Sequence, residues 1–232
     1  MSKEALFTVA SQTLTPKLNR LSGTTNIILG ELYGYLKGGG TFYDDPRTYL
    51  LSHDPEGVSK VLPLTEFEGM GGTPSRFPLT VDILRGLFSD RFVSAHISSL
   101  SPGTDFKAHS DARSKNMRVY VPLVLPHPLN SSGVWIEGKG VRHHFFGLWR
   151  MHALSTRHSM FNYTSAETYV LVIDLKIVSP KEAKDSPVDN SPSPEFFGVA
   201  VESSPPILPI GEQDDEDMYC AELPLLHEDR FW

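Results

Sequence analysis

Three residues that can bind a metal are spaced so that they can share one site. One residue separates His109 from Asp111, and His158 follows much later in the chain. In an extended segment, side chains two residues apart project to the same side, so the first two can reach one ion together. Two histidines and a carboxylate on one face of an ion leave coordination positions open, an arrangement typical of non-haem Fe(II) sites. The pattern predicts an Fe(II) site at these three residues.

The segment 91–178 is expected to supply the strands that position these ligands. It contains short stretches rich in β-branched and aromatic residues, separated by Gly and Pro turns, which indicates a sandwich or barrel. The expected strands are Phe92–Leu100, Met117–Leu125, Val134–Ile136, Phe145–Met151, Arg157–Tyr163 and Thr168–Val178. Before them, helical patterns mix with turn signals, and apolar spacing predicts a short helix over Thr80–Ser89.

A His-x-Asp sequence alone is weak evidence for a metal. The chain has nine histidines and 28 acidic residues, so a chance match is easy. Surface or hydrogen-bonded core positions are also commoner roles for a histidine than metal binding. The surrounding sequence must therefore decide the interpretation.

That sequence resembles the aspartyl/asparaginyl β-hydroxylase family of Fe(II)- and 2-oxoglutarate-dependent oxygenases. Several weak motifs follow the family's order at nearly its spacing. They are Ser98, Pro102-Gly103-Thr104 ahead of His109, the strand RVYVPLVLP with Arg118, Gly147 ahead of His158, Asn162 and the closing LVIDL. The resemblance implies a mainly β fold, a double-stranded β-helix or jelly roll, with flanking N-terminal helices and iron at its open end.

The resemblance also implies roles for single residues. His109 and His158 match the family's two metal histidines, and Asp111 stands where some members keep a carboxylate and others have glycine. Arg118 matches an arginine that helps bind a 2-oxoglutarate carboxylate, a task that suits the planar guanidinium. An outward-facing strand position is the structural alternative for Arg118. Two further residues fall on positions that line the same co-substrate pocket, Ser98 and Tyr120.

One position departs from the family pattern. Where this chain has Thr168, family members usually place an arginine that binds the far carboxylate of 2-oxoglutarate, and threonine carries no charge. Three explanations are open: another cation replaces the arginine, the co-substrate differs, or the activity is lost. The candidate cations are Arg150, Arg157, Arg142 and Lys107.

These residues lead us to expect a hydroxylase with Fe(II) as cofactor and 2-oxoglutarate and dioxygen as co-substrates. The expected substrate is an amino acid, a peptide side chain or an amino-acid-derived small molecule. The alternative is a catalytically inactive jelly-roll protein that binds a metal or ligand, or acts as a scaffold. The uncharged Thr168 favours this alternative, whereas the intact ligand set favours the enzyme.

Other histidines and aromatic residues are expected to be structural. The pair His143-His144 lies beside a glycine-rich turn and predicts a polar loop or strand edge. His152 is expected to have a structural role, with a place inside the barrel against substrate as the alternative. Aromatic core packing, rather than a substrate pocket wall, is expected for Trp135, Trp149 and Phe161.

Composition suggests a single domain followed by a tail. The chain has 232 residues, of which 40% are hydrophobic and 21% are charged, which is ordinary for a globular protein. We expect one oxygenase-like domain over residues 1–179 and a partly disordered, Pro-rich acidic tail over residues 180–232. The acidic run Glu212–Asp217 is expected to be solvated, with a basic partner or calcium as alternatives.

Charge and hydropathy limit the partners that are expected. Residues 181–232 hold 13 acidic and 3 basic residues while the whole chain has a net charge of −7, so the remainder is mildly basic. That balance suits small anionic ligands and is too weak for nucleic acid. Because there is one cysteine, Cys220, and no long apolar run, we expect a cytoplasmic protein without membrane or signal segments.

Overall fold

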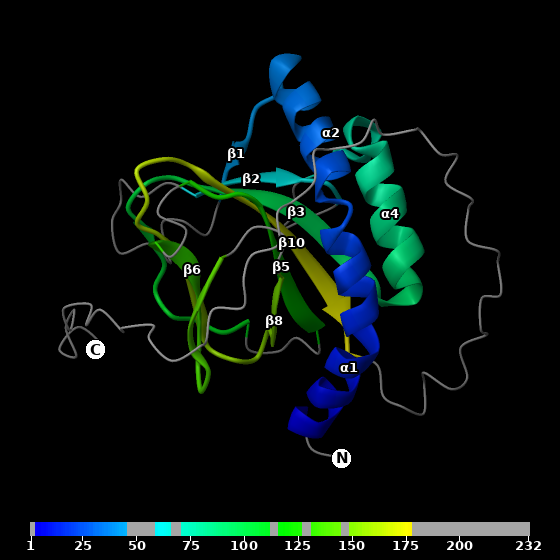
Figure 1. Cartoon of the computed structure of the whole chain (residues 1–232), viewed down its shortest axis with the longest axis vertical. Helices are drawn as coiled ribbons and strands as arrows, with labels where there is room; N and C mark the ends of the chain where they lie inside the picture. The colour runs from blue at the N-terminus through cyan, green and yellow to red at the C-terminus, as the bar shows by residue number, and fades with distance from the viewer. Residues whose placement is uncertain are drawn as a thin grey trace, which may run out of the picture. The chain divides into compact units, whose positions relative to one another are not determined.

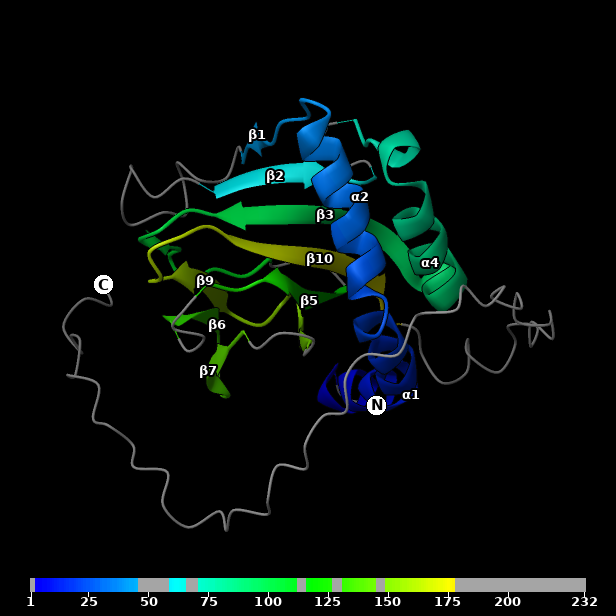
Figure 2. The same ribbon diagram turned by 45° about the horizontal axis from the view of Figure 1, so that its top comes forward.

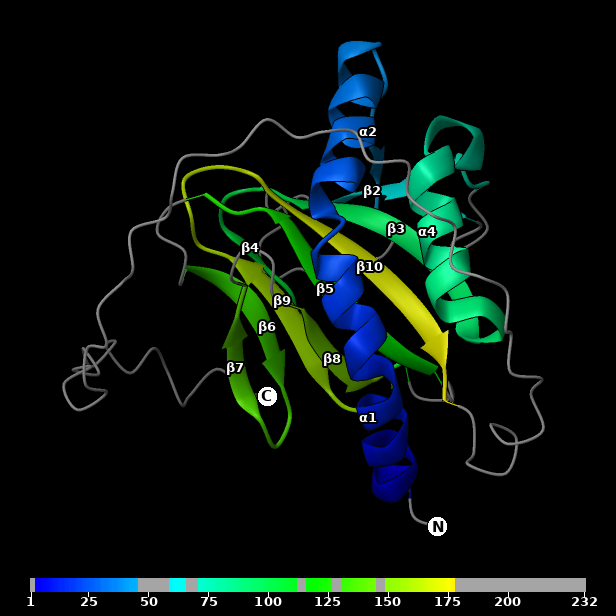
Figure 3. The ribbon, with the colours of Figure 1, turned by 45° about the vertical axis from the view of Figure 1, so that its right-hand side comes forward.

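Two antiparallel β-sheets pack face to face in the computed structural model, which describes residues 3–45, 59–65, 71–111, 116–126, 131–144 and 149–177 (Figure 1). The six-stranded sheet has the order β1 (Tyr43–Asp44), β2 (Ser59–Pro63), β3 (Phe92–Leu100), β10 (Thr168–Lys176), β5 (Asn116–Val124) and β8 (Arg150–Ala153). The four-stranded sheet, seen in Figure 3, has the order β4 (Thr104–Asp105), β9 (His158–Asn162), β6 (Ser132–Ile136) and β7 (Gly140–His143). This arrangement confirms the predicted jelly roll.

Helices cover the outer face of the six-stranded sheet (Figure 2). Within the described residues these are α1 (Lys3–Ser22), α2 (Thr25–Lys37) and α4 (Pro78–Phe88), with short 3₁₀ turns η1 (Pro74–Arg76) and η2 (Ser89–Arg91). Their apolar side chains meet those of the sheet in the larger core. It includes Leu14, Leu18, Leu21, Ile28, Leu32, Phe77, Val81, Leu84, Phe88, Ala95, Ile97, Val119, Val121, Leu171 and Ile173. Trp149 packs against this core, as predicted.

The three strands at the centre of this sheet, β3, β5 and β10, are buried on both faces. Odd-numbered residues such as Ile97, Val119 and Leu171 join the helix-side core. Because successive side chains alternate between faces, even-numbered residues turn into the space between the sheets. A second, smaller core lies there, formed by Leu100, Phe106, Tyr120, Val134, Ile136, Met160, Val170 and Val172.

The structure confirms most predicted elements and adds four strands. β1 and β2 precede the segment 91–178 that was expected to hold the strands, and β2 pairs with β3 along its length. The short strands β4 and β7 lie within that segment and were not predicted. The strand expected over Phe145–Met151 is observed as β8, which begins at Arg150; residues 145–148 and the predicted tail, 180–232, lie outside the described residues. In the described part of the chain, no helix is both long and apolar enough to cross a membrane.

The start of α4 is capped by a side chain from α2. The backbone N–H groups of Leu79 and Thr80 donate to the Glu31 carboxylate at 2.9 and 2.8 Å, and the Thr80 hydroxyl donates at 2.6 Å. The first N–H groups of a helix have no acceptor within the helix, and a negative charge there is favoured by the helix dipole. Glu31 therefore joins the two helices at the face of the sheet.

We predict that Glu31→Ala lowers the free energy of unfolding by about 1–2 kcal/mol, because it removes both the cap and the favourable charge. Urea denaturation followed by circular dichroism measures this change. Asp82→Ala is the control, since Asp82 is exposed on α4 and its loss should stay within about 0.5 kcal/mol. Equal effects of the two substitutions would contradict the capping role.

A buried ion pair joins β5 to β10 between the sheets. Arg118 and Asp174 are direct cross-strand partners, and Nε and Nη2 of the arginine donate to the two carboxylate oxygens at 2.8 and 2.9 Å. The hydroxyl of Ser94 on β3 also donates to Asp174, at 3.4 Å. Burial by itself would lower the pKa of Arg118. The hydrogen bonds and the negative charge of Asp174 have the larger combined effect and raise this pKa above its ordinary value. The guanidinium is therefore charged.

We predict that Asp174→Ala lowers the free energy of unfolding by about 3–5 kcal/mol, because it leaves the Arg118 charge buried without its main partner. The double variant Arg118→Met/Asp174→Leu should lose less than the single variant, since it removes both charges and keeps the volume. Chemical denaturation of both variants tests this order. The prediction fails if the double variant is the less stable one.

Candidate metal centre

The backbone holds His109 and His158 opposite each other. Each residue donates its N–H to the carbonyl of the other, at 3.0 Å from His109 and 2.8 Å from His158. The same antiparallel pairing continues where the N–H of Phe106 donates to the carbonyl of Met160 at 2.9 Å, and then into β4 and β9. Two residues that are far apart in the sequence are thus brought together by main-chain hydrogen bonds.

Both imidazole rings are oriented by the same kind of hydrogen bond. Nδ1 of His109 lies 2.9 Å from the carbonyl oxygen of Lys107, and Nδ1 of His158 lies 2.8 Å from that of Thr156. Because a carbonyl only accepts, each Nδ1 carries the proton and each Nε2 keeps its lone pair. The ring centroids are 4.6 Å apart, and Nε2 of His158 is buried without a hydrogen-bond partner. Each Nε2 atom therefore has a free lone pair that can bind a metal ion.

The environment of His158 keeps its ring neutral. The residue is only 1% exposed. The pKa of His158 is lowered to about 2, mainly by burial and to a smaller extent by the charge of His152. Since a metal binds the neutral imidazole, this burial favours the form that can act as a ligand.

Asp111 lies beside this pair but is turned toward Arg118. Its Oδ2 is 3.4 Å from Nη1 of Arg118, and its side chain is 35% exposed. Across the described residues, no group of three or more His, Cys, Asp or Glu side chains is arranged to hold a metal ion. The structure thus brings the two predicted histidine ligands together and leaves the predicted carboxylate ligand at the side, in contact with an arginine.

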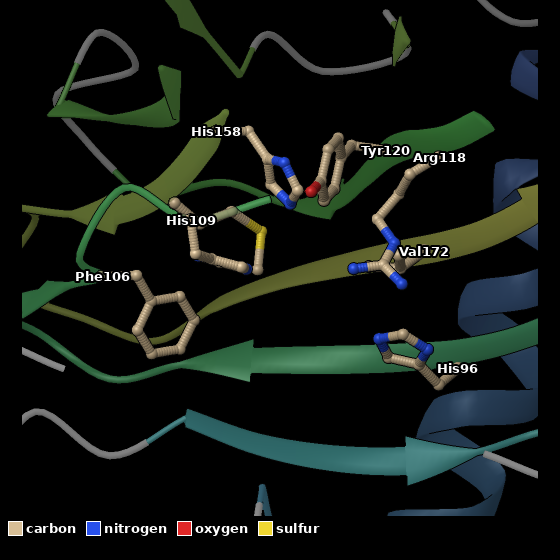
Figure 4. A pocket seen from close by; sticks show the side chains of 8 residues that line it. His96, Phe106, His109, Arg118, Tyr120, His158 and Val172 are labelled. Carbon is tan, nitrogen blue, oxygen red and sulfur yellow. The ribbon is translucent and has the colours of Figure 1, made fainter. Parts of the chain in front are cut away.

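A cavity opens next to the histidine pair (Figure 4). It is lined by His96, Phe106, His109, Arg118, Tyr120, His158, Met160 and Val172. In the close-up, the imidazole of His158 lies beside the phenol of Tyr120, and the guanidinium of Arg118 lies between Tyr120 and His96. The lining thus combines polar groups with an apolar wall, and the cavity volume of about 10 Å³ is close to the room that one water molecule needs.

Two further histidines are closer to this cavity than the sequence indicated. His152 is 1% exposed, its ring centroid is 4.1 Å from that of His158, and its Nε2 lies 3.3 Å from the Tyr120 hydroxyl. Its Nδ1 is 2.9 Å from the carbonyl of Ala153, so Nε2 accepts from the phenol. The expectation of a polar loop or strand edge is wrong for His144, which is fully buried near Tyr120, and this burial lowers its pKa to about 3.

Sequence reasoning also missed Asp174 and His96. An acidic residue inside the apolar run LVIDL is a signal for a buried partner, because an aspartate is seldom fully buried unless it is paired. His96 precedes Ser98 by two residues on one strand, so alternation alone places both on the same face. Only the pairing of the strands shows that Arg118 is the partner of Asp174.

The residues matched to a co-substrate pocket fall into two groups. Arg118 and Tyr120 line the cavity. Ser98 and Thr168 are fully buried on the interior faces of β3 and β10, beyond the lining residues, and their hydroxyls have no hydrogen-bond partner in the described part of the chain. Thr168 pairs with the residue two positions after Ser98, so the two are diagonal neighbours.

The candidate cations for the missing arginine lie away from the cavity lining. Lys107, Arg142 and Arg157 are exposed. Arg150 is partly buried on the edge strand β8, opposite Tyr120. Burial, followed by the charge of Arg142, lowers the pKa of Arg150. Arg150 is therefore the candidate nearest to the site by strand register.

The solved structures to which the chain is similar include cupins. A predicted oxalate decarboxylase from Thermotoga maritima is 12% identical, over 58% of this chain and 93% of that chain, with a TM-score of 0.36. An RmlC-like cupin protein from Desulfovibrio desulfuricans is 20% identical, over 38% and 74% of the two chains, with a TM-score of 0.30. The protein TT1209 from Thermus thermophilus is 18% identical, over 39% and 78%, with a TM-score of 0.31. These likenesses say nothing about function. Among curated proteins, none matches the chain.

A family model gives the more informative comparison. The model described as aspartyl/asparaginyl beta-hydroxylase matches residues 64–177. This range contains α4, the strands from β3 to β10 and every residue considered for the metal and the co-substrate. It confirms the resemblance inferred from the motifs around His109 and His158. Over residues 64–177, the chain is therefore similar to the aspartyl/asparaginyl β-hydroxylase family.

Proposed function

We propose that this chain is a non-haem Fe(II)- and 2-oxoglutarate-dependent hydroxylase. The observation that carries the proposal is the pair formed by His109 and His158, whose Nδ1 atoms both donate to backbone carbonyls and whose Nε2 atoms are thereby left as electron-pair donors. The match of residues 64–177 to a hydroxylase family model supports the reaction type. The proposed substrate is an amino acid, a peptide side chain or a small molecule derived from an amino acid.

The donor set fits a divalent iron ion. Imidazole and carboxylate ligands suit Fe(II), and three of them on one face leave positions for co-substrates. His109 and His158 would hold the ion together with Asp111, which exchanges its contact with Arg118 for the metal. That exchange is local, because Asp111 is only two residues from His109 and its side chain is partly exposed. Bound Fe(II) supplies the activation of dioxygen.

The cavity wall supports this chemistry in three ways. Arg118 provides a buried positive charge beside the histidine pair, which favours the carboxylate end of an oxo acid. The Tyr120 hydroxyl donates to His152, which holds the phenol ring in a fixed position in the wall. The apolar side chains of Phe106, Met160 and Val172 keep water away from the reacting atoms.

A second candidate function is a jelly roll that binds a metal or ligand without turnover. The uncharged Thr168 favours it, because no family-type arginine is available at that position. The pairing of Arg118 with Asp174 also favours it, since much of the arginine's hydrogen-bonding capacity is already in use. Measured turnover separates this candidate from the enzyme.

The function is tested by succinate production from 2-oxoglutarate. The full-length protein should form succinate under air when Fe(II) is present, and should form none without the metal. His158→Ala should remove this activity. If the wild-type protein binds Fe(II) and 2-oxoglutarate but forms no succinate, the non-catalytic candidate is correct.

We predict that His109→Ala and His158→Ala each weaken Fe(II) binding by about 100-fold or more. Each removes a direct ligand, and the loss of only a hydrogen-bond partner of a ligand already weakens binding by about 10–100-fold. Asp111→Ala should also weaken binding, but by less, since its carboxylate is turned away from the histidine pair. Anaerobic calorimetric titration measures these affinities. His143→Ala is the matched control, because that ring packs against Phe161 on β9. Unchanged affinity in the His158 variant would remove the proposed site.

A further inference from the structure

One phenol hydroxyl lies beside two imidazole rings that can each accept its proton. Nε2 of His158 and Nε2 of His152 both keep a lone pair, because each Nδ1 faces a backbone carbonyl, at 2.8 and 2.9 Å. The two rings are adjacent, with centroids 4.1 Å apart. The phenol of Tyr120 lines the same cavity as His158 and lies beside its imidazole (Figure 4). Because a hydroxyl has one proton, Tyr120 can donate to only one of the two rings at a time.

Tyr120 donates to His152 and leaves the proposed metal ligand free. Its hydroxyl lies 3.3 Å from Nε2 of His152. In contrast, Nε2 of His158 is buried and has no hydrogen-bond partner in the described part of the chain. The Tyr120 and His152 rings are stacked, with centroids 5.6 Å apart, and both residues are 1% exposed. His152 therefore fixes the direction of the phenol hydroxyl and keeps it off the lone pair of His158.

The small volume of the cavity makes this hydroxyl a competitor for a metal ion. The cavity volume is about 10 Å³, close to the room that one water molecule needs. Among the described residues that line it, Tyr120 is the one with an oxygen in its side chain. A deprotonated phenol is a good ligand for iron, and tyrosine is an axial iron ligand in some haem proteins. An unrestrained Tyr120 could thus take a coordination position that a co-substrate needs.

We propose that His152 is a positioning residue that holds the Tyr120 hydroxyl away from a metal bound to His109 and His158. The inference rests on the metal site of the proposed function and adds a residue that protects its open coordination positions. When the acceptor at residue 152 is removed, the phenol turns to the metal, loses its proton to water and binds as a phenolate. One oxygen–metal bond forms, one O–H bond breaks, and no electron is transferred.

The test is the visible absorption of the full-length protein loaded with Fe(III), because a phenolate on Fe(III) gives a charge-transfer band that imidazole and carboxylate ligands do not give. The wild-type protein should lack this band. His152→Leu removes the acceptor and nearly keeps the volume, so it should show the band, and adding Tyr120→Phe should abolish it. His152→Gln should restore the wild-type spectrum, since its amide carbonyl can still accept from the phenol.

His144→Leu is the matched control. His144 is also fully buried near Tyr120, with ring centroids 6.5 Å apart, and its ring nitrogens have no hydrogen-bond partner in the described residues. This variant should leave the spectrum unchanged. Circular dichroism checks the fold of each variant. If His152→Leu does not fold, His152→Asn takes its place, because its polar side chain ends too early to reach the phenol.

Two outcomes would overturn the inference and leave the metal site intact. One is a band in the wild-type protein that Tyr120→Phe removes, which would show that the phenol already binds the metal. The other is a folded His152→Leu or His152→Asn variant that binds Fe(III) and shows no band. If the wild-type protein binds neither Fe(II) nor Fe(III), the proposed function fails together with the inference.

Discussion

The burial of β3, β5 and β10 on both faces is the constraint on which the rest of the structure depends. Most of their odd-numbered residues are apolar and pack against the helices, and their buried even-numbered residues face the second sheet. Since the two faces are interleaved, the buried polar residues at even positions of these strands enter the interior. There each needs a protein partner, an ordered water or a ligand. The site is therefore formed by the same alternation that forms the core.

Arg118 shows how a charge is kept in that interior. Asp174 fills two of its donor positions, and the third nitrogen faces Asp111 at the longer distance of 3.4 Å. The shorter, fully buried contacts hold the guanidinium in place. Asp111 can consequently turn to a metal without leaving the arginine unpaired. Asp174, rather than Asp111, is therefore the main partner of the buried guanidinium.

Sequence alone predicted the parts of this molecule that follow from local pattern. The strands, α4 and the approach of His109 to His158 are confirmed, because alternation, helical spacing and motif order are all visible along the chain. The partners of the buried polar groups were not predictable in the same way. That Asp174 faces Arg118, or that His144 turns inward, depends on which strands become neighbours, and pairing between distant segments leaves little trace in one sequence. β2 was not predicted, because its five residues, Ser59–Pro63, show only a weak strand pattern.

The two halves of the site differ in what fixes their geometry. Main-chain groups hold the histidine pair, through hydrogen bonds between the two residues and through the backbone carbonyl that each Nδ1 contacts. The geometry of the pair therefore depends on the strand pairing and on His109 and His158 themselves. The far end depends on single side chains, because Ser98 and Thr168 each present one hydroxyl to the interior. A substitution there changes charge and hydrogen bonding without disturbing the main-chain pairs that hold the metal ligands. The departure at Thr168 is thus compatible with an intact histidine pair, because none of the hydrogen bonds that hold this pair involves Thr168.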